Sequence, residues 1–110
     1  MTGHLAPGGH PVEAELQIDS VTVVHPAEAV ATVRCLLGPV RLGARFDRIR
    51  DSTETIDLEL TRILYYHRPV DELYPVHTAL VTLRGAGVRL LASADLNSGW
   101  QAIAGANPPP

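Results

Sequence analysis

The sequence predicts an all-β protein whose strands form a small closed or nearly closed antiparallel β-barrel. About seven short segments rich in β-branched and aromatic residues are separated by turn residues such as Gly, Pro, Asn and Asp. No segment shows the sustained periodicity of about 3.6 residues that is typical of an amphipathic helix. The chain has 110 residues, of which 45% are hydrophobic and 19% are charged, so it can bury the core of one domain.

The first expected strand covers residues 15–24 (ELQIDSVTVV). Its apolar side chains lie on one face as far as Ile18 and on the other face from Val21 onward, where Val23 follows. A β-bulge at Asp19-Ser20 would produce this change of phase, and bulges are common where a barrel strand bends. The following His-Pro pair ends the strand, because proline cannot donate to a β-ladder.

The next three expected strands surround a Gly-Pro turn. Residues 29–37 (AVATVRCLL) are too rich in β-branched residues for a stable helix and long enough for a strand. After the turn, residues 40–42 are expected to form a very short strand. Gly43 then allows the backbone geometry that starts the strand at residues 45–50.

Residues 55–66 (TIDLELTRILYY) show the clearest alternation in the chain. Ile56, Leu58 and Leu60 share one face and acidic residues share the other, which predicts a half-buried antiparallel strand. The alternation changes phase again near Thr61. A second bulge is therefore expected in this strand.

The last part of the chain is expected to contain three more strands. Residues 74–84 (YPVHTALVTLR) form the longest apolar segment and should lie centrally, and residues 88–94 and 100–104 follow after short turns. Residues 67–73 are expected to form a loop, with one helical turn after Pro69.

Both ends of the chain are expected to be disordered, because Gly and Pro dominate them and little can be buried there. The expected tails are residues 1–12 and residues 105–110, with a barrel domain at residues 13–104 between them. His4 and His10 lie in the first tail, and we expect them to be solvated rather than to hold a metal ion.

Composition excludes some chemistry and indicates a compartment. All nine basic residues are arginine, which excludes Schiff-base lysine catalysis and a P-loop lysine. The single cysteine, Cys35, cannot form an internal disulfide and is flanked by apolar residues, which predicts a buried side chain in a reducing compartment. Neither a signal peptide nor a run of about 18 apolar residues occurs, so we expect a cytoplasmic protein without membrane contact.

Opposite charges are segregated along the chain. The formal net charge is −3, which does not favour general attraction to nucleic acid. Residues 34–50 contain five arginines and one acidic residue, whereas residues 51–59 contain four acidic residues and no basic one. A basic segment is therefore followed directly by an acidic segment.

The segment VATVRCLLGPVRLGARFDRI resembles the hallmark region of the β-barrel second domain of translational GTPases such as elongation factor Tu. In that family a strand leads to Gly-x-Val/Ile-x-x-Gly and then to a hydrophobic strand, and Gly38, Val40 and Gly43 stand in these positions. Similar flanking motifs follow the same order: DSV at residues 19–21, then VTLRG, then LNSGWQAI. The resemblance covers residues 15–104.

This resemblance implies a barrel of the translation-factor type that stands alone. In the family, the barrel packs against a GTPase domain and helps to contact tRNA or ribosomal RNA. The chain has no Gly-x-x-x-x-Gly-Lys-Ser/Thr motif and no lysine to complete one, so no nucleotide is expected. It also has Tyr74-Pro75 where the family usually places a small residue and a glycine, which departs from the family at that loop.

Basic and aromatic residues of the chain are candidates for contact with RNA or a partner protein. Arginines bind phosphate, and tyrosine or histidine rings stack on bases. We favour the alternative interpretation, a solvated barrel exterior that is ion-paired with the acidic segment, because phosphate binding draws on many basic contacts. The candidate residues are Arg34, Arg41, Arg45, Arg48, Arg50, Tyr65, Tyr66, His67 and Arg68.

A second polar group consists of His67, Asp71, Glu72 and His77. These residue types can hold a metal ion or transfer protons, but their spacing matches no familiar ligand set, so we expect them to be solvated. The serines lack the Gly-x-Ser-x-Gly context of a nucleophile elbow. We therefore expect no catalytic residue, no cofactor and no metal site.

The leading functional hypothesis is a non-enzymatic module that binds another protein through an exposed face or edge of the barrel. It rests on the family pattern, the missing GTPase motif and the segregated charges. The alternative is an RNA- or ribosome-associated protein that uses the face of residues 34–50. A second alternative is a small enzyme or ligand-binding barrel.

Overall fold

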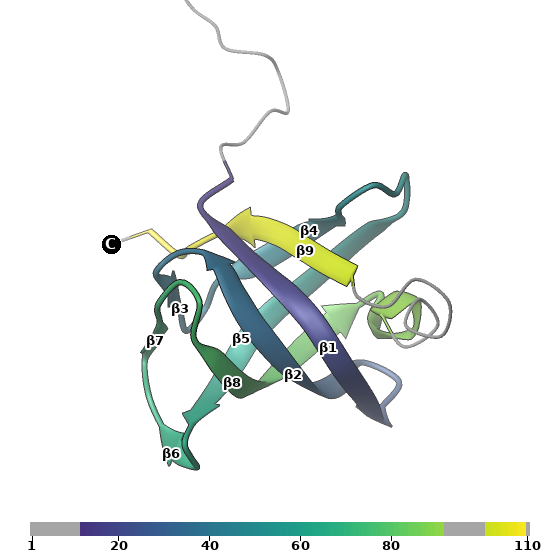
Figure 1. Ribbon diagram of the computed structural model, residues 1–110. Helices are drawn as coiled ribbons and strands as arrows, with labels where there is room; N and C mark the ends of the chain where they lie inside the picture. Colours follow the sequence, from purple (N-terminus) through teal and green to yellow (C-terminus); the bar gives the residue numbers. More distant parts are fainter. Residues whose placement is uncertain (1–11, 92–100, 110) are drawn as a thin grey trace, which may run out of the picture.

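The computed structural model describes residues 12–91 and 101–109, which form nine strands and one helical turn (Figure 1). In chain order the strands are β1 (Ala14–His25), β2 (Glu28–Leu37), β3 (Val40–Arg41), β4 (Arg45–Ile49), β5 (Thr55–Tyr65), β6 (Arg68–Pro69), β7 (Glu72–Leu73), β8 (Thr78–Ala86) and β9 (Gln101–Ala106).

Six of these strands close into an antiparallel barrel. Neighbours pair in the order β4-β9-β1-β2-β8-β5, and β5 pairs with β4 to complete the circle. β6 pairs with the end of β5, and β3 and β7 form a separate two-stranded sheet. Figure 1 shows β3, β6 and β7 on the same side of the barrel. The prediction of an all-β closed barrel is confirmed.

The two phase changes in the sequence correspond to irregular strand pairing. The register of β1 against β2 shifts between Ile18 and Ser20, and that of β5 against β8 shifts between Leu60 and Arg62. An extra residue in one strand bends it and increases its twist, as a small barrel requires. Both predicted bulge positions are confirmed.

The second half of β1 leaves the closed part of the barrel. β9 pairs with β1 only as far as Ile18, whereas β2 follows β1 to its end at His25. Val21 still packs against the core, but Val23 is exposed. Val21 and Val23 were expected to share one apolar face, but only Val21 meets the core, because none of the described strands pairs with that edge of β1 beyond Ile18.

Apolar side chains from the barrel strands fill the interior. Ile56, Leu58 and Leu60 of β5 point inward as predicted, and Phe46 of β4 is fully buried. Among the described residues, no polar or charged residue is buried. Cys35 is also buried, as predicted, and desolvation raises the pKa of its thiol.

Residues 88–91 form a helical turn, so the strand expected at residues 88–94 is wrong in its described part. Val88 and Leu91 are both buried, and a spacing of three places them on the same face of a helix. Gly87, with a positive φ of 102°, redirects the chain after β8. A short apolar run does not by itself distinguish a strand from a buried helical turn.

Three other boundaries differ from expectation. Residues 74–77 form a turn, and β8 begins only at Thr78. The segment after β5 forms β6 and β7 instead of a helical turn after Pro69. β9 continues to Ala106, so residues 105–106 belong to the barrel and not to the expected tail.

Some expectations concern residues outside the described part of the chain. These are the first tail at residues 1–11, with His4 and His10, and the turn and strand start at residues 92–100. Within the described ranges, no helix has the length and apolar composition that crossing a bilayer requires.

Candidate functional site

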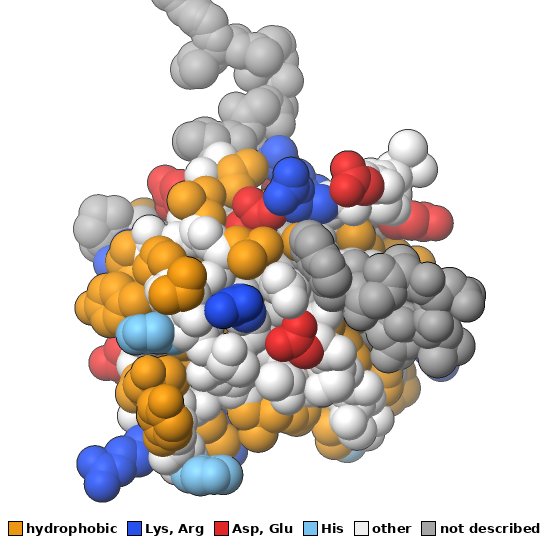
Figure 2. Space-filling view, viewed as in Figure 1, with side chains coloured by type: hydrophobic (Ala, Val, Ile, Leu, Met, Phe, Trp, Pro, Cys, Tyr) orange, Lys and Arg blue, Asp and Glu red, His pale blue; other side chains and the backbone are white. Residues whose placement is uncertain are grey.

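Large apolar side chains are exposed at the end of the barrel where residues 74–77 pass β2. The Cys35 N–H donates to the His77 carbonyl at 2.9 Å, and the Val76 N–H donates to the Cys35 carbonyl at 2.8 Å. Figure 2 shows hydrophobic side chains gathered at the left of the view, where Figure 1 places β3, β6 and β7. The exposed residues that we call the apolar end surface are Leu36, Leu37, Tyr66, Tyr74 and Val76.

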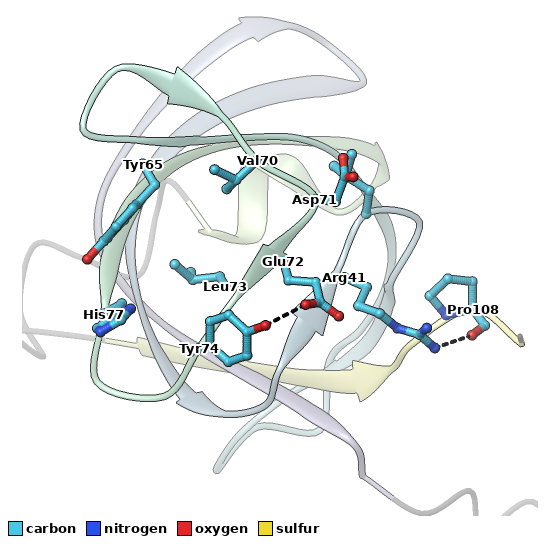
Figure 3. A pocket seen from close by; sticks show the side chains of 10 residues that line it. Arg41, Tyr65, Val70, Asp71, Glu72, Leu73, Tyr74, His77 and Pro108 are labelled. Carbon is cyan, nitrogen blue, oxygen red and sulfur yellow. Dashed lines mark hydrogen bonds between the residues drawn. The ribbon is translucent and has the colours of Figure 1, made fainter.

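A groove with a volume of about 640 Å³ adjoins this surface (Figure 3). Its size falls within the range of small-ligand pockets. The apolar residues that line it are Leu42, Tyr65, Val70, Leu73, Tyr74 and Pro108. The polar residues that line it are Arg41, Asp71, Glu72 and His77.

The two-residue strands β3 and β7 position the middle of the groove. Val40 pairs with Leu73, and Arg41 pairs with Glu72. Val40 and Leu73 are buried and anchor this small sheet in the core. Because successive side chains of a strand point to opposite faces, Arg41 and Glu72 are turned outward to the groove.

An aromatic wall closes one side of the groove. Tyr65, the last residue of β5, stacks on His77 with ring centroids 5.2 Å apart and an angle of 19° between the planes. Tyr66 meets Tyr65 edge-on with centroids 4.5 Å apart. Desolvation raises the pKa of Tyr65, and the charge and hydrogen bonding of the neighbouring Tyr66 raise it further. The phenol therefore stays neutral through the physiological pH range.

The exposed residues beside this wall have strained backbones. Tyr65 pairs with Arg68, so Tyr66 and His67 are the two central residues of a hairpin turn. Their φ angles are 52° and 67°, and Val76 has a φ of 67°. Positive φ at both central positions is the requirement of a type I′ turn, which Asn-Gly normally meets. Bulky and β-branched residues rarely adopt this conformation.

A short hydrogen bond joins two residues of the groove. The Tyr74 hydroxyl donates to Glu72 Oε1 at 2.6 Å (Figure 3). This hydrogen bond, and then the charge of the Glu72 carboxylate, raise the pKa of Tyr74. Tyr74 is half exposed, so its ring is accessible at the mouth of the groove while its hydroxyl is held.

The chain after β9 forms the opposite rim. Arg41 Nη2 donates to the Pro108 carbonyl at 3.1 Å. The Asn107 side chain accepts from the Arg41 N–H at 2.9 Å and donates to the Pro39 carbonyl at 2.9 Å. The Asn107 N–H also donates to Glu13 Oε1 at 3.1 Å. These contacts hold Pro108 against the groove, although the sequence predicts a disordered tail from residue 105.

The structure does not gather the five predicted arginines at the groove. Arg41 lies on its rim, whereas Arg34 is exposed on β2. The other three form ion pairs on the barrel exterior, with Asp57 in the acidic segment among the partners. These pairs are Arg45–Asp57 at 2.9 Å, Arg48–Asp47 at 3.2 Å and Arg50–Glu15 at 2.8 Å.

The other candidate residues do converge. Tyr65, Tyr66, His67 and Arg68 lie together on the β5–β6 hairpin beside the groove. Of the second polar group, Asp71, Glu72 and His77 line the groove, and His67 lies at the hairpin tip. Within residues 12–91 and 101–109, no group of three His, Cys, Asp or Glu side chains could hold a metal ion.

Sequence reasoning missed several residues of the site. Leu73 and Pro108 line the groove, and Asn107 holds its rim. Tyr74 was marked only by the departure of Tyr74-Pro75 from the family pattern. Asn107 carried no local signal, because its side chain bonds Arg41 and Pro39, which lie 66 and 68 residues earlier in the chain.

Comparison with known proteins supports the fold. No family model matches the chain, and no curated protein matches it. Among solved structures, it is similar to translation elongation factor SelB from Methanococcus maripaludis in its apo form, with a TM-score of 0.64 and 14% identity. The match covers 82% of this chain and 18% of that one, so this chain spans less than a fifth of the SelB chain. The barrel is thus similar in fold to part of a translation factor.

Proposed function

We propose that this chain is a non-enzymatic protein-interaction module built on a barrel of the translation-factor type. The observation that carries the proposal is the apolar end surface beside the groove. Tyr66 is 77% exposed and Val76 is 69% exposed, and exposed apolar patches that adjoin a groove mark interaction sites. A partner protein docks on this end of the barrel.

Backbone strain supports a binding role for this surface. A left-handed conformation costs about 1–2 kcal/mol for a residue with a side chain. Val76 adopts it with a φ of 67° while its side chain stays exposed, so burial within this chain does not offset the cost. The hydrogen bond from the Val76 N–H to the Cys35 carbonyl holds this conformation, and residues held in strained conformations cluster at functional positions. Burial of the Val76 side chain against a partner would offset the free-energy cost of this conformation.

The charges near the groove favour a protein over a nucleic acid. Asp71 and Glu72 line the groove, and the guanidinium of Arg41, also in the lining, is bonded to the Pro108 carbonyl. The two carboxylates would repel the phosphate groups of a nucleic acid bound in the groove. With a net charge of −3, the molecule as a whole adds no attraction for RNA.

A second candidate function, RNA association, is favoured by one observation. Tyr66, His67 and Arg68 are exposed together on one hairpin, and aromatic rings next to a cation are typical of single-stranded RNA contacts. This function predicts binding that weakens steeply with salt and on Arg68→Glu, which reverses the charge on this hairpin.

Affinity purification with protein and RNA identification tests the proposal. We expect the full chain to recover a protein partner reproducibly. Val76→Asp is expected to lose this partner, because burying an unpaired charge in the interface costs free energy. Val24→Asp is the matched control, since Val24 is also an exposed valine but lies near the end of β1. Recovery of no protein, with salt-sensitive RNA binding by the purified chain, would replace the proposal with the RNA function.

A further inference from the structure

We infer that the groove receives an arginine side chain of the partner, set between apolar neighbours in an extended peptide. This inference rests on the proposed function and specifies the chemistry of its ligand. Three features of the groove carry it: two carboxylates without an ion-pair partner, an aromatic wall and an apolar floor.

The carboxylates of the groove lack a cation. Asp71 and Glu72 form no ion pair within the described part of the chain. Arg41 pairs with Glu72 through the backbone of β3 and β7, but Figure 3 shows its side chain extending toward Pro108 and away from the carboxylate. The geometry leaves negative charge that a basic ligand would neutralise.

Glu72 is oriented to accept from a ligand. Its Oε1 accepts the Tyr74 hydroxyl at 2.6 Å, which restricts the carboxylate to one orientation, and Oε2 remains available. A carboxylate held in this way forms a charge-assisted hydrogen bond with less loss of side-chain entropy. Tyr74 thus acts as a positioning residue for Glu72.

The aromatic wall favours arginine over lysine. Tyr65 and His77 are stacked, and Tyr74 lines the same groove. A guanidinium is planar, stacks on aromatic faces and donates to a carboxylate at the same time, whereas an ammonium is a compact and strongly hydrated point charge. Aromatic rings and a carboxylate, the two groups that an arginine side chain would contact, therefore line the same groove.

The rest of the groove suits the neighbouring residues of a peptide. Leu42, Val70 and Leu73 provide an apolar floor, and Leu36, Leu37 and Val76 continue it as an exposed surface. A volume of about 640 Å³ exceeds the space that one arginine side chain fills. An apolar residue next to the arginine would occupy the remainder.

Peptide titration of the ¹⁵N-labelled full chain, followed by amide chemical shifts, tests the inference. The probe is acetyl-Leu-Arg-Leu-amide, compared with its lysine and citrulline analogues; citrulline has the shape of arginine without the charge. We expect the arginine peptide to shift the amides of residues 71–74, 76 and 77 and to bind about tenfold or more tightly than the citrulline peptide, as for a charge-assisted hydrogen bond. The lysine peptide is expected to lie between them.

Variants separate the groove from general electrostatics. Glu72→Gln keeps an acceptor for Tyr74 and is expected to weaken arginine-peptide binding about tenfold. Glu54→Gln removes the same charge from an exposed position outside the groove lining and is expected to leave binding unchanged. Equal binding of the arginine and citrulline peptides, equal binding by Glu72→Gln, or no groove shift at millimolar peptide would overturn the inference.

The outcomes also distinguish this inference from the proposed function. If Val76→Asp abolishes partner recovery but the arginine peptide does not bind, the end surface docks a protein through other chemistry, and only the inference fails. If a single-stranded RNA oligonucleotide shifts the groove residues and partner recovery does not depend on Val76, both fail.

Discussion

At the scale of single residues, the three positions that carried the family resemblance each have a physical role. Val40 is fully buried and pairs with Leu73 under the groove. Gly38 packs its backbone against the Cys35 sulfur, where an added Cβ would lie 2.8 Å from Sγ. Gly43 has a φ of 89°, and a Cβ added there would lie 3.2 Å from the Pro108 ring. The motif was therefore predictive because every position in it is constrained by packing or by backbone conformation.

Replacement of Gly43 tests the backbone constraint. Gly43→Ala is expected to lower the free energy of unfolding by about 1–2 kcal/mol, because its φ of 89° is unfavourable for a residue with a Cβ. Gly43→Asn is the matched control, since Asn tolerates positive φ better than Ala does. Urea denaturation measures both. Equal losses in the two variants would instead assign the effect to the contact with Pro108, which lies 3.2 Å from an added Cβ.

The hydrogen bond between Tyr74 and Glu72 predicts a pH effect. The bond and the carboxylate charge raise the pKa of Tyr74 above the ordinary value of 10.0. The stabilisation that this represents is complete below that ordinary value and is lost as pH rises through the pKa of Tyr74 in the folded protein. Glu72→Gln is expected to lower the pKa of Tyr74, measured by absorbance titration of the three tyrosines.

Glu54→Gln is the control for this titration, because Glu54 does not line the groove. It should leave the tyrosine titration unchanged. Coincident curves for the native chain and Glu72→Gln would show that the carboxylate does not control Tyr74.

At the scale of elements, regular patterns predicted strands well and predicted the groove poorly. Alternation located β5 and both bulges, because a buried face repeats over many residues. The strand expected at residues 88–94 failed because a short apolar run also fits a buried helical turn. β3 and β7 have two residues each and leave no repeat to recognise. Their pairing, which forms the groove, depends on tertiary contacts of Val40 and Leu73.

The same limit explains the mixed result for the candidate site. Tyr65 to Arg68 were recognised by residue type, and the structure places them on one hairpin beside the groove. Asn107 and Pro108 were assigned to a tail, because Gly and Pro composition indicates disorder unless a specific contact holds the segment. The contact that holds them comes from Arg41 of β3, which precedes Asn107 by 66 positions and Pro108 by 67 positions.

The β5–β6 hairpin provides a prediction at this scale. Replacement of Tyr66-His67 by Asn-Gly is expected to raise the free energy of unfolding by about 1–2 kcal/mol, because both φ angles are positive. It is also expected to reduce partner recovery, since Tyr66 belongs to the apolar end surface. Urea denaturation and affinity purification measure the two effects. His67→Gly alone should give part of the gain in stability and keep Tyr66; a loss of stability in both variants would contradict the strain.

At the scale of the whole molecule, the barrel separates two kinds of surface. The exterior of β4 and β5 carries paired opposite charges, such as Arg45 with Asp57, whereas the end with β3, β6 and β7 carries exposed apolar side chains. Ion pairs on an exposed exterior contribute little to stability and give little directional attraction for a partner. The similarity to part of SelB concerns the fold, and a shared fold hosts many functions. In the proposed function, the specificity of this chain therefore depends on the groove end.

The position of β9 has a consequence for how the protein is made. β9 lies between β1 and β4, and Ile103 pairs with both Leu16 and Ile49. A nascent chain that has not yet emerged past residue 106 therefore has two strands with unpaired edges and no means of closing the barrel. Closure must wait for a contact between distant parts of the chain, which slows folding. Until then, the edges of β1 and β4 that β9 will cover can pair with another chain, which favours aggregation.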